Sequence, residues 1–408
     1  MRFLSKVKSG VKYGALVDIG SASVLVAIVK SSINKQSPEV IWSKREYISL
    51  RENQTLDNNP KLVMTCLINA LMLLDDEGKK ALREKENVTK IPLVQVSLSA
   101  PWSKTVTKSI SYSHDEDFRI SEELVEELVR TSLTKATEGE LNGEGMREGA
   151  EIIYAKSLQG LIANGYTLRK PNNQSAKSLF VIQSYASSQK YIHDTIIEAI
   201  EKVLPEAKVE LLPFILLYYY VLRDLEPELT DYYLINISFE ASEIAVIRDG
   251  LLKHTSFAPV GAYTLARQIS NELKVPVDEA YSYLKEESPD FELKLYSKEK
   301  VSGVNKIFAG YIETMSNLFQ DTGDELSIPK KIYLHDNLKT EMFFASQIEK
   351  AAKLRTKSSH ATYRVTSLIL DNKYSPEEKA KLEKTDIDTT LLLSAQFFHM
   401  ELYQGRFD

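Results

Sequence analysis

The sequence contains one strand–turn–strand pattern twice, and the two copies lie about 220 residues apart. The first copy spans residues 13–30 around a polar turn at residues 18–23. The second spans residues 231–252 around a polar turn at residues 236–243. Apolar, β-branched runs that are separated by Gly, Ser or Asn are typical of β-hairpins. Two such hairpins so far apart predict two similar lobes rather than one continuous core.

The segments around the hairpins predict an α/β fold in which the sequence divides into five parts. We expect a first lobe that begins with residues 1–90 and is interrupted by an inserted α+β module at residues 91–187. Residues 188–230 are expected to continue the first lobe and connect it to the second, at residues 231–370. Residues 371–408 are expected to return to the first lobe as a final helix.

Alternating and helical patterns of apolar residues predict the remaining elements. Strands are expected at residues 39–49, 104–111, 151–158, 178–184, 331–334 and 358–370. Helices are expected at residues 60–74, 121–135, 188–204, 262–273, 278–287, 298–319, 340–354 and 389–403. Ser121 is expected to cap the first turn of its helix, because a serine hydroxyl accepts a hydrogen bond from a free backbone N–H there. Residues 79–90 and 142–149 are expected to be polar connections.

Composition limits the functional classes. The chain has 51 Lys+Arg against 57 Asp+Glu and a net charge of −6, so it has no overall positive field to attract nucleic acid. Its apolar runs are shorter than the roughly 18 residues that cross a bilayer, and residues 1–11 are too short for a signal peptide. We therefore expect a cytoplasmic protein.

The six His and the single Cys66 show no metal-ligand spacing, and Cys66 is expected to be a buried structural thiol.

The first turn has the chemistry of an anion site. Backbone N–H groups and hydroxyls in a turn of Gly and Ser can converge on one phosphate. The carboxylate of Asp18 in the same turn can position Mg²⁺ through water. Two such turns that face each other from opposing lobes would hold the phosphates of a nucleotide between them.

The run Asp18-Ile19-Gly20-Ser21-Ala22-Ser23 resembles the first phosphate loop of the actin superfamily, in the version found in FtsA and PilM. The resemblance extends over most of the chain and implies an actin-like, ribonuclease H-like duplicated fold with two lobes. It also implies that the insertion at residues 91–187 is a subdomain of the SHS2 type, which those two families carry at this place.

The resemblance further implies ATP and Mg²⁺ as cofactors and assigns their binding residues. Asp18 would be the metal residue. The residues that would bind the nucleotide lie in the two turns, at the start of the following helix and on the adenosine side: Asp18, Gly20, Ser21, Ser23, Asn236, Ser238, Ser242, Gly261 and Lys285.

The second turn departs from the family pattern. Where the family has an Asp and several glycines, this chain has Asn236, Phe239, Glu240 and Ala241. Glycines in such a turn permit left-handed backbone angles, so we expect strain at Phe239 and Ala241. Glu240 adds negative charge where phosphates would lie, which opposes phosphoryl transfer. His335-Asp336-Asn337 also replaces the glycines of the adenosine loop, so ATP hydrolysis is expected to be weak or absent, with no catalytic residue.

Two functions remain open. The first is a cytoplasmic scaffold or adaptor of a membrane-associated machine, similar to PilM in type IV pilus assembly or to FtsA in cell division. It would act by self-association and by binding protein partners of that machine. The alternative is an active, ATP-binding and polymerising ATPase of the FtsA type. A sugar kinase is a third class, but the sequence lacks a catalytic Asp in a sugar-binding context.

The end of the chain favours the PilM-like arrangement. FtsA ends in a basic amphipathic helix that lies on the membrane. Residues 389–403 contain no Lys or Arg and are expected to form the last helix of the fold. Phe3, Leu4 and Val7 lie among basic residues at the start of the chain and could give a weak membrane contact, and a disordered leader is the alternative.

Overall fold

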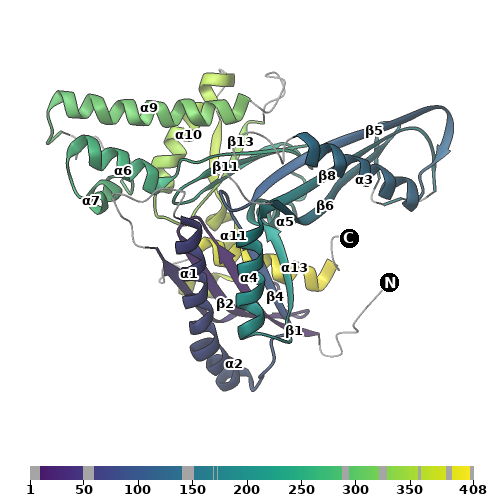
Figure 1. Cartoon of the computed structure of the whole chain (residues 1–408), viewed down its shortest axis with the longest axis horizontal. Helices are drawn as coiled ribbons and strands as arrows, with labels where there is room; N and C mark the ends of the chain where they lie inside the picture. Colours follow the sequence, from purple (N-terminus) through teal and green to yellow (C-terminus); the bar gives the residue numbers. More distant parts are fainter. Residues whose placement is uncertain are drawn as a thin grey trace.

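The computed structural model of the chain describes residues 10–48, 59–139, 151–168, 170–171, 173–286, 294–320, 329–356, 360–382 and 388–404. In these residues the strands form three sheets, two of five strands and one of four. Figure 1 shows the two five-stranded sheets in the body of the molecule, and the four-stranded sheet projecting to one side.

The first sheet has the strand order β3-β2-β1-β4-β9. Strands β1, β2 and β3 are antiparallel, and β4 and β9 continue the sheet in parallel. The bounds are β1 (Val11–Ile19), β2 (Ser23–Ser32), β3 (Glu39–Tyr47), β4 (Leu93–Leu98) and β9 (Lys208–Pro213).

The second sheet repeats this plan. Its order is β12-β11-β10-β13-β14, with three antiparallel strands followed by two parallel ones. The bounds are β10 (Tyr232–Ile237), β11 (Ser242–Arg248), β12 (Leu251–Ala258), β13 (Lys331–Asp336) and β14 (Ala361–Arg364). Both predicted hairpins are confirmed, as β1–β2 and β10–β11, and each occupies the equivalent place in its sheet.

Helices cover both faces of each sheet. The outer face of the first sheet packs against α1 and α4, and the far face of the second sheet packs against α6, α9 and α10. Between the sheets lie α5, α11 and α13. The bounds are α1 (Asn59–Leu73), a π-helical turn η1 (Leu74–Gly78), α2 (Lys79–Glu86), α4 (Lys190–Val203), α5 (Phe214–Leu225), α6 (Ala262–Leu273), α7 (Val277–Tyr283), α9 (Lys298–Gln320), α10 (Glu341–Thr356), α11 (Val365–Lys373), α12 (Pro376–Leu382) and α13 (Thr389–Gln404).

The layering explains the continuous apolar runs of the sequence. Strands that are covered on both faces lose the polar alternation of a half-exposed strand, and every residue of β10 is buried. Helix α5 lies between two sheets, so most of its surface is apolar and buried. Helix α13 approaches β1 closely because Gly14 has no side chain there: a Cβ at Gly14 would lie 2.3 Å from the ring of Phe398.

The four-stranded sheet has the order β5-β8-β6-β7, and α3 packs on one of its faces. Its bounds are β5 (Lys104–Arg119), β6 (Glu151–Ala163), β7 (Tyr166–Leu168), β8 (Ser175–Gln189) and α3 (Glu122–Gly139). The predicted cap is confirmed, because Ser121 Oγ accepts a hydrogen bond from the N–H of Leu124 at 3.2 Å. The sheet is tied to the second lobe, where Thr255 Oγ1 donates to the carbonyl of Thr105 at 2.6 Å.

Several sequence-based expectations need correction. The inserted module cannot begin at residue 91, because β4 pairs with β1 and β9 inside the first sheet. In the described part of the strand expected at residues 358–370, only residues 361–364 form a strand, and the helix α11 follows directly. Part of the expected polar connection at residues 79–90 is the helix α2, whose apolar Leu82 is buried against the first sheet. The expected loop at 142–149 and the leader at 1–9 lie outside the described residues.

Within the described parts of the chain, no helix combines the length and the apolar character needed to cross a bilayer.

Candidate functional site

The first turn is held in place by backbone groups of its own lobe. The N–H of Gly20 donates to the carbonyl of Ser23 at 2.9 Å, which closes the turn between β1 and β2. The indole N–H of Trp102 donates to the carbonyl of Gly20 at 2.9 Å, and the N–H of Ser99 donates to the carbonyl of Ile19 at 3.1 Å. The turn is therefore fixed from the β4 side of the sheet.

The second turn is closed by a serine side chain. The N–H and the hydroxyl of Ser238 both donate to the carbonyl of Ala241, each at 2.9 Å, and the N–H of Ala241 donates to Ser238 Oγ at 3.2 Å. Neither Phe239 nor Ala241 has a positive φ. The expected backbone strain is therefore wrong, because this turn uses side-chain hydrogen bonds and needs no left-handed residue.

Gly261 lies directly against the second turn. A Cβ at Gly261 would be 2.3 Å from the carbonyl oxygen of Ser238, so only glycine fits. The N–H of Ala262 donates to that carbonyl at 3.2 Å, and the N–H of Tyr263 donates to the carbonyl of Phe239 at 2.7 Å. The first N–H groups of α6, which could otherwise bind an anion, are bonded to the turn instead.

The two turns touch each other. Ser21 Oγ donates to Ser238 Oγ at 3.0 Å and accepts from the N–H of Glu240 at 3.0 Å. A cavity of about 30 Å³ remains beside this contact, room for roughly two water molecules. The predicted residues that line it are Asp18, Gly20, Ser21, Ser23, Asn236 and Ser238.

Glu240 does not present its charge to this cavity. Its carboxylate accepts hydrogen bonds from the guanidinium of Arg267 at 2.8 and 2.5 Å and from the hydroxyl of Thr264 at 2.9 Å. The residue is 1% exposed. The expectation that Glu240 adds free negative charge between the turns is therefore wrong, because α6 supplies a bidentate partner.

Asp18 is buried, and its carboxylate is bound by protein groups. Ser97 Oγ donates to one of its oxygens at 2.6 Å, and the guanidinium of Arg45 lies 4.0 Å from the other. Burial raises the pKa of Asp18 to about 6, although Arg45 and Ser97 act in the opposite direction. Among the described residues no group of three or more His, Cys, Asp or Glu is arranged to hold a metal ion.

Arg45 and Asp388 form a bidentate ion pair beside the first turn. The guanidinium of Arg45 donates to both carboxylate oxygens of Asp388, at 2.6 and 3.0 Å, and to Ser23 Oγ at 2.9 Å. Asp388 in turn accepts from the N–H of Leu391 at 3.0 Å, which caps α13. Burial works to raise the pKa of Asp388, but the guanidinium outweighs it and holds that pKa below its ordinary value. The contact joins the first turn, the edge strand β3 and the start of α13.

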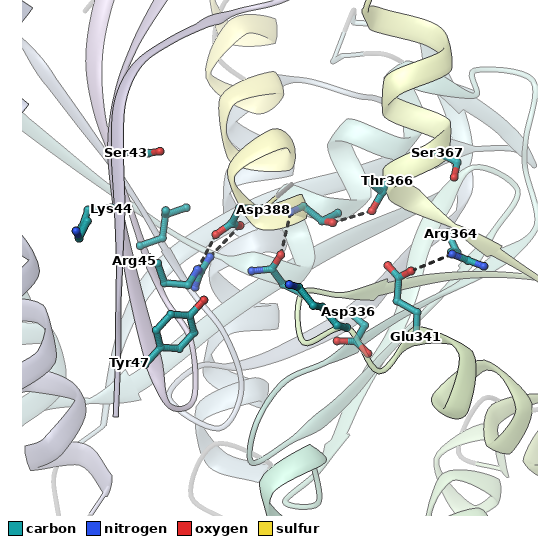
Figure 2. A pocket seen from close by; sticks show the side chains of 14 residues that line it. Ser43, Lys44, Arg45, Tyr47, Asp336, Glu341, Arg364, Thr366, Ser367 and Asp388 are labelled. Carbon is teal, nitrogen blue, oxygen red and sulfur yellow. Dashed lines mark hydrogen bonds and ion pairs between the residues drawn. The ribbon is translucent and has the colours of Figure 1, made fainter. Parts of the chain in front are cut away.

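A larger cavity of about 480 Å³ lies on the other side of Arg45. Figure 2 shows Arg45 reaching from β3 to Asp388, and Arg364 pairing with Glu341 across the cavity from them, at 3.6 Å. Its lining residues come from β2, β3, the ends of β13 and β14, the starts of α10, α11 and α13, and the connections next to them: Leu25, Ser43, Lys44, Arg45, Tyr47, Asp336, Asn337, Lys339, Glu341, Arg364, Thr366, Ser367, Asp388 and Thr389.

Asn236 binds protein groups as well. Its side-chain oxygen lies 2.8 Å from Nδ1 of His335, and Nε2 of His335 lies 3.3 Å from the hydroxyl of Thr390. Burial lowers the pKa of His335 to about 3, so the ring is neutral at pH 7. The adjacent Asp336 accepts instead from the N–H of Leu338 at 2.6 Å and from Thr340. His335 and Asp336 therefore do not form a catalytic pair.

Three of the nine predicted residues line neither cavity: Ser242, Gly261 and Lys285. Ser242 Oγ donates to the carbonyl of Val260 at 2.7 Å. Lys285 places its ammonium 4.8 Å from the ring centroid of Tyr281. The structure thus brings six of the nine predicted residues together at the turns, packs Gly261 against the second turn, places Ser242 at the start of β11 after that turn, and leaves Lys285 apart.

The fold and the two turns can be compared with those of known proteins. The structure resembles a solved structure of the PilM-PilN type IV pilus biogenesis complex, with a TM-score of 0.58 and 13% identical residues. The match covers 96% of this chain and 98% of that chain, and this chain has two sheets of the same strand order with their hairpin turns in contact. The chain has the actin-like fold.

Other actin-like and related structures match less well. Ethanolamine utilization protein EutJ from Carboxydothermus hydrogenoformans has a TM-score of 0.43 and 11% identity, over 95% of this chain and 89% of that one. A Bacteroides thetaiotaomicron protein with an actin-like ATPase fold and unknown function has a TM-score of 0.39 and 9% identity, over 94% and 99%. No protein-family model and no curated protein sequence matches the chain.

A nucleotide does not fit the two turns of this actin-like chain as they stand. The hydroxyls of Ser21 and Ser238 bond to each other, the hydroxyl of Ser23 accepts from Arg45, and the start of α6 is bonded to the second turn. Asp18, the expected metal residue, faces the guanidinium of Arg45. The groups that would bind phosphate and Mg²⁺ therefore already have partners within the protein.

Arg45 and Asp388 were not predicted as site residues. One signal was available in the sequence: Asp388 directly precedes the last helix, at a position where Asp commonly caps. Arg45 belongs to β3, and Ser43, Lys44 and Tyr47 of the same strand also line the larger cavity. The sequence of the strand does not identify the partner of Arg45, which is more than 300 residues away.

Proposed function

We propose that the chain is an actin-like adaptor that binds protein partners of a membrane-associated machine and does not hydrolyse ATP. The machine would be of the pilus-assembly kind, as for PilM, or of the cell-division kind, as for FtsA. Likeness in fold to PilM over nearly the whole of both chains supports the first kind. The protein would reach the inner face of the membrane through its partner.

One observation carries this proposal. The hydroxyls of Ser21 and Ser238 are 3.0 Å apart, so the two turns occupy the space that phosphates need. Catalysis of phosphoryl transfer requires groups placed around the phosphates and free to stabilise their charge. Here those groups stabilise the contact between the lobes, and an adaptor keeps its shape without a nucleotide.

The four-stranded sheet with α3 is proposed to be an inserted subdomain of the SHS2 type, bounded by the ends of β5 and β8. We propose residues 10–98 and 190–230 for the first lobe, 231–370 for the second and 371–408 as the return to the first. Self-association of the full chain is also part of the proposal. Sedimentation equilibrium of the purified protein tests it, and a monomer at all concentrations would contradict it.

Titration calorimetry with Mg-ATP tests the adaptor role. We expect no heat of binding for the wild-type chain, and the same result for Asp18→Ala. Micromolar binding that disappears in Asp18→Ala would overturn the proposal and support the alternative, an ATP-binding and polymerising ATPase. A thermal unfolding scan of both proteins shows that each is folded, so an absent heat cannot come from misfolding.

A further inference from the structure

Helix α1 presents an uncharged surface at the outside of the first lobe. This surface, called the α1 face below, consists of the exposed residues Leu62, Thr65, Ile68, Asn69 and Met72. Leu62 is 37% exposed, Ile68 47% and Met72 63%. The hydroxyl of Thr65 donates to the carbonyl of Lys61 at 2.9 Å, so this donor already has a partner within the helix. The α1 face is therefore mostly apolar although it lies in water.

The neighbouring helix α4 has an ordinary outer side. Both helices cover the same face of the first sheet, and Figure 1 shows them side by side. The exposed residues of α4 include Lys190, Glu198, Glu201 and Lys202. None of residues 62–73 of α1 is charged. A helix without charges on any side is typical of helices that are covered on all sides, so the α1 face is expected to have a cover.

The spacing of the residues fits a second helix as that cover. Lys61, Thr65, Ile68, Met72 and Asp75 follow one another at alternating steps of four and three residues, and all five are exposed. Steps of this kind place side chains in one seam along a helix, and two such seams pack against each other. The seam runs along the whole of α1 and into the turn η1 that follows it.

The charges at the two ends of the α1 face have opposite signs. Lys61 is exposed at one end and Asp76 at the other, and Asp75 is paired with Lys79 at 2.5 Å. If two copies packed α1 in parallel, lysine would meet lysine and aspartate would meet aspartate. In an antiparallel pair with its two-fold axis between residues 68 and 69, each Lys61 lies beside Asp76 of the other copy. The charges therefore match a second α1 that runs in the opposite direction.

We propose that two copies of this chain form a two-fold symmetric dimer through their α1 faces, with the two helices antiparallel. Ile68 and Asn69 lie at the axis, and Met72 of each copy packs beside Thr65 of the other. Such an interface is self-complementary and closed, as in most homo-oligomers. Because one short helix from each copy covers a small area, the dimer is expected to be weak and to depend on concentration. The dimer rests on the self-association proposed above, and it adds the surface and the symmetry.

Sedimentation equilibrium of the full chain over a range of concentrations measures this dimer. Met72→Glu places a charge in the α1 face of both copies, so the dissociation constant should rise by about tenfold or more. Leu354→Glu is the matched control, because Leu354 is 64% exposed on α10 and lies outside the α1 face. It should leave the dissociation constant unchanged. Both variants should unfold near the wild-type temperature, because both side chains are exposed.

Charge reversal tests the direction of the helices. Lys61→Glu and Asp76→Lys should each weaken the dimer about threefold, because like charges then meet at both ends of the pair. The double variant should recover most of the wild-type dissociation constant, since opposite charges meet again. In a parallel pair, like charges would meet in the wild type and in the double variant alike, and no recovery would follow.

Three results would overturn the dimer: a dissociation constant that Met72→Glu leaves unchanged, a double charge variant no tighter than the single ones, or a wild-type chain that is monomeric at all concentrations. A monomer that floats with phosphatidylcholine vesicles, and no longer floats as Met72→Glu, would assign the α1 face to a membrane instead. An oligomer that survives Met72→Glu would remove this surface and leave the proposed self-association standing. A wild-type monomer would contradict the self-association itself, and the Mg-ATP titration tests the adaptor role separately.

Discussion

The two turns are held in place in different ways. At the first turn, the guanidinium of Arg45 donates to Ser23 Oγ and to the carboxylate of Asp388. At the second turn, Gly261 packs against the carbonyl oxygen of Ser238. A buried ion pair costs stability when one partner is removed, whereas close backbone packing costs stability when a side chain is added. The first turn therefore depends on one ion pair, and the second depends on the absence of a side chain at one position.

The largest expected effect comes from removing the guanidinium at the turns. Arg45→Met leaves Asp388 and Asp18 buried without a cation, and their desolvation is then uncompensated. We expect the free energy of unfolding to fall by about 3–5 kcal/mol, measured by urea denaturation.

Lys44→Met is the matched control for that change. Lys44 is the exposed neighbour of Arg45 on β3, and its replacement should change the free energy of unfolding by less than about 0.5 kcal/mol. Adding Asp388→Asn to Arg45→Met should recover part of the loss. If both single variants lose equally little, the first turn is not held by this ion pair, and the contrast between the two turns fails.

A smaller effect is expected where the second turn meets α6. Gly261→Ala places a Cβ 2.3 Å from the carbonyl oxygen of Ser238, so the turn or the helix must shift. We expect a loss of about 1–3 kcal/mol in the same denaturation measurement. Gly310→Ala in α9, where no atom lies within 4 Å of the added Cβ, should instead gain about 0.5–1 kcal/mol. Equal effects at both glycines would show that the turn is loosely packed.

The last expected effect is a change in pH dependence. Burial raises the pKa of Glu243, beside Asn236, from an ordinary 4.5 to about 8, although a hydrogen bond with Asn236 lowers it. The unfolded chain therefore loses this proton near pH 4.5 and the folded chain only near pH 8. Stability should fall by about 1 kcal/mol per pH unit through that window from this group.

Glu243→Gln removes this titration, so the stability of the variant should depend less on pH between 4.5 and 8 than that of the wild type. Urea denaturation at several pH values measures it. Glu116→Gln, at an exposed position, should leave the wild-type slope unchanged. A Glu243→Gln protein with the wild-type slope would mean that Glu243 is already ionised in the folded state.

The duplicated plan of the fold was predictable, because each hairpin is a local pattern of apolar runs around a polar turn. The bounds of α6 were predicted to the residue, since Gly261 precedes an amphipathic run. The strand expected at residues 358–370 was largely wrong. Val365, Ile369 and Leu370 are buried in the layer between the lobes, and an apolar run that is buried on several sides does not distinguish a strand from a helix.

The candidate site was predicted in its location and not in its chemistry. The sequence places Ser21 and Ser238 in equivalent turns, but it does not say that their hydroxyls bond to each other. Arg45 and Asp388 were missed because their roles depend on a contact between segments far apart in the chain. Local patterns give the face of a strand or helix, and only the packed structure gives the partner across it.

The position of α13 has a consequence for how the protein is made. Leu16, Ala27 and Val29 of the first hairpin form a buried cluster with Ala395 and Phe398 of α13. A ribosome releases the hairpin more than 350 residues before α13, so this apolar face has no cover until α13 has been made. The first lobe therefore completes its core only after α13 has emerged, and a nascent chain stalled before α13 would expose an apolar surface that chaperones bind.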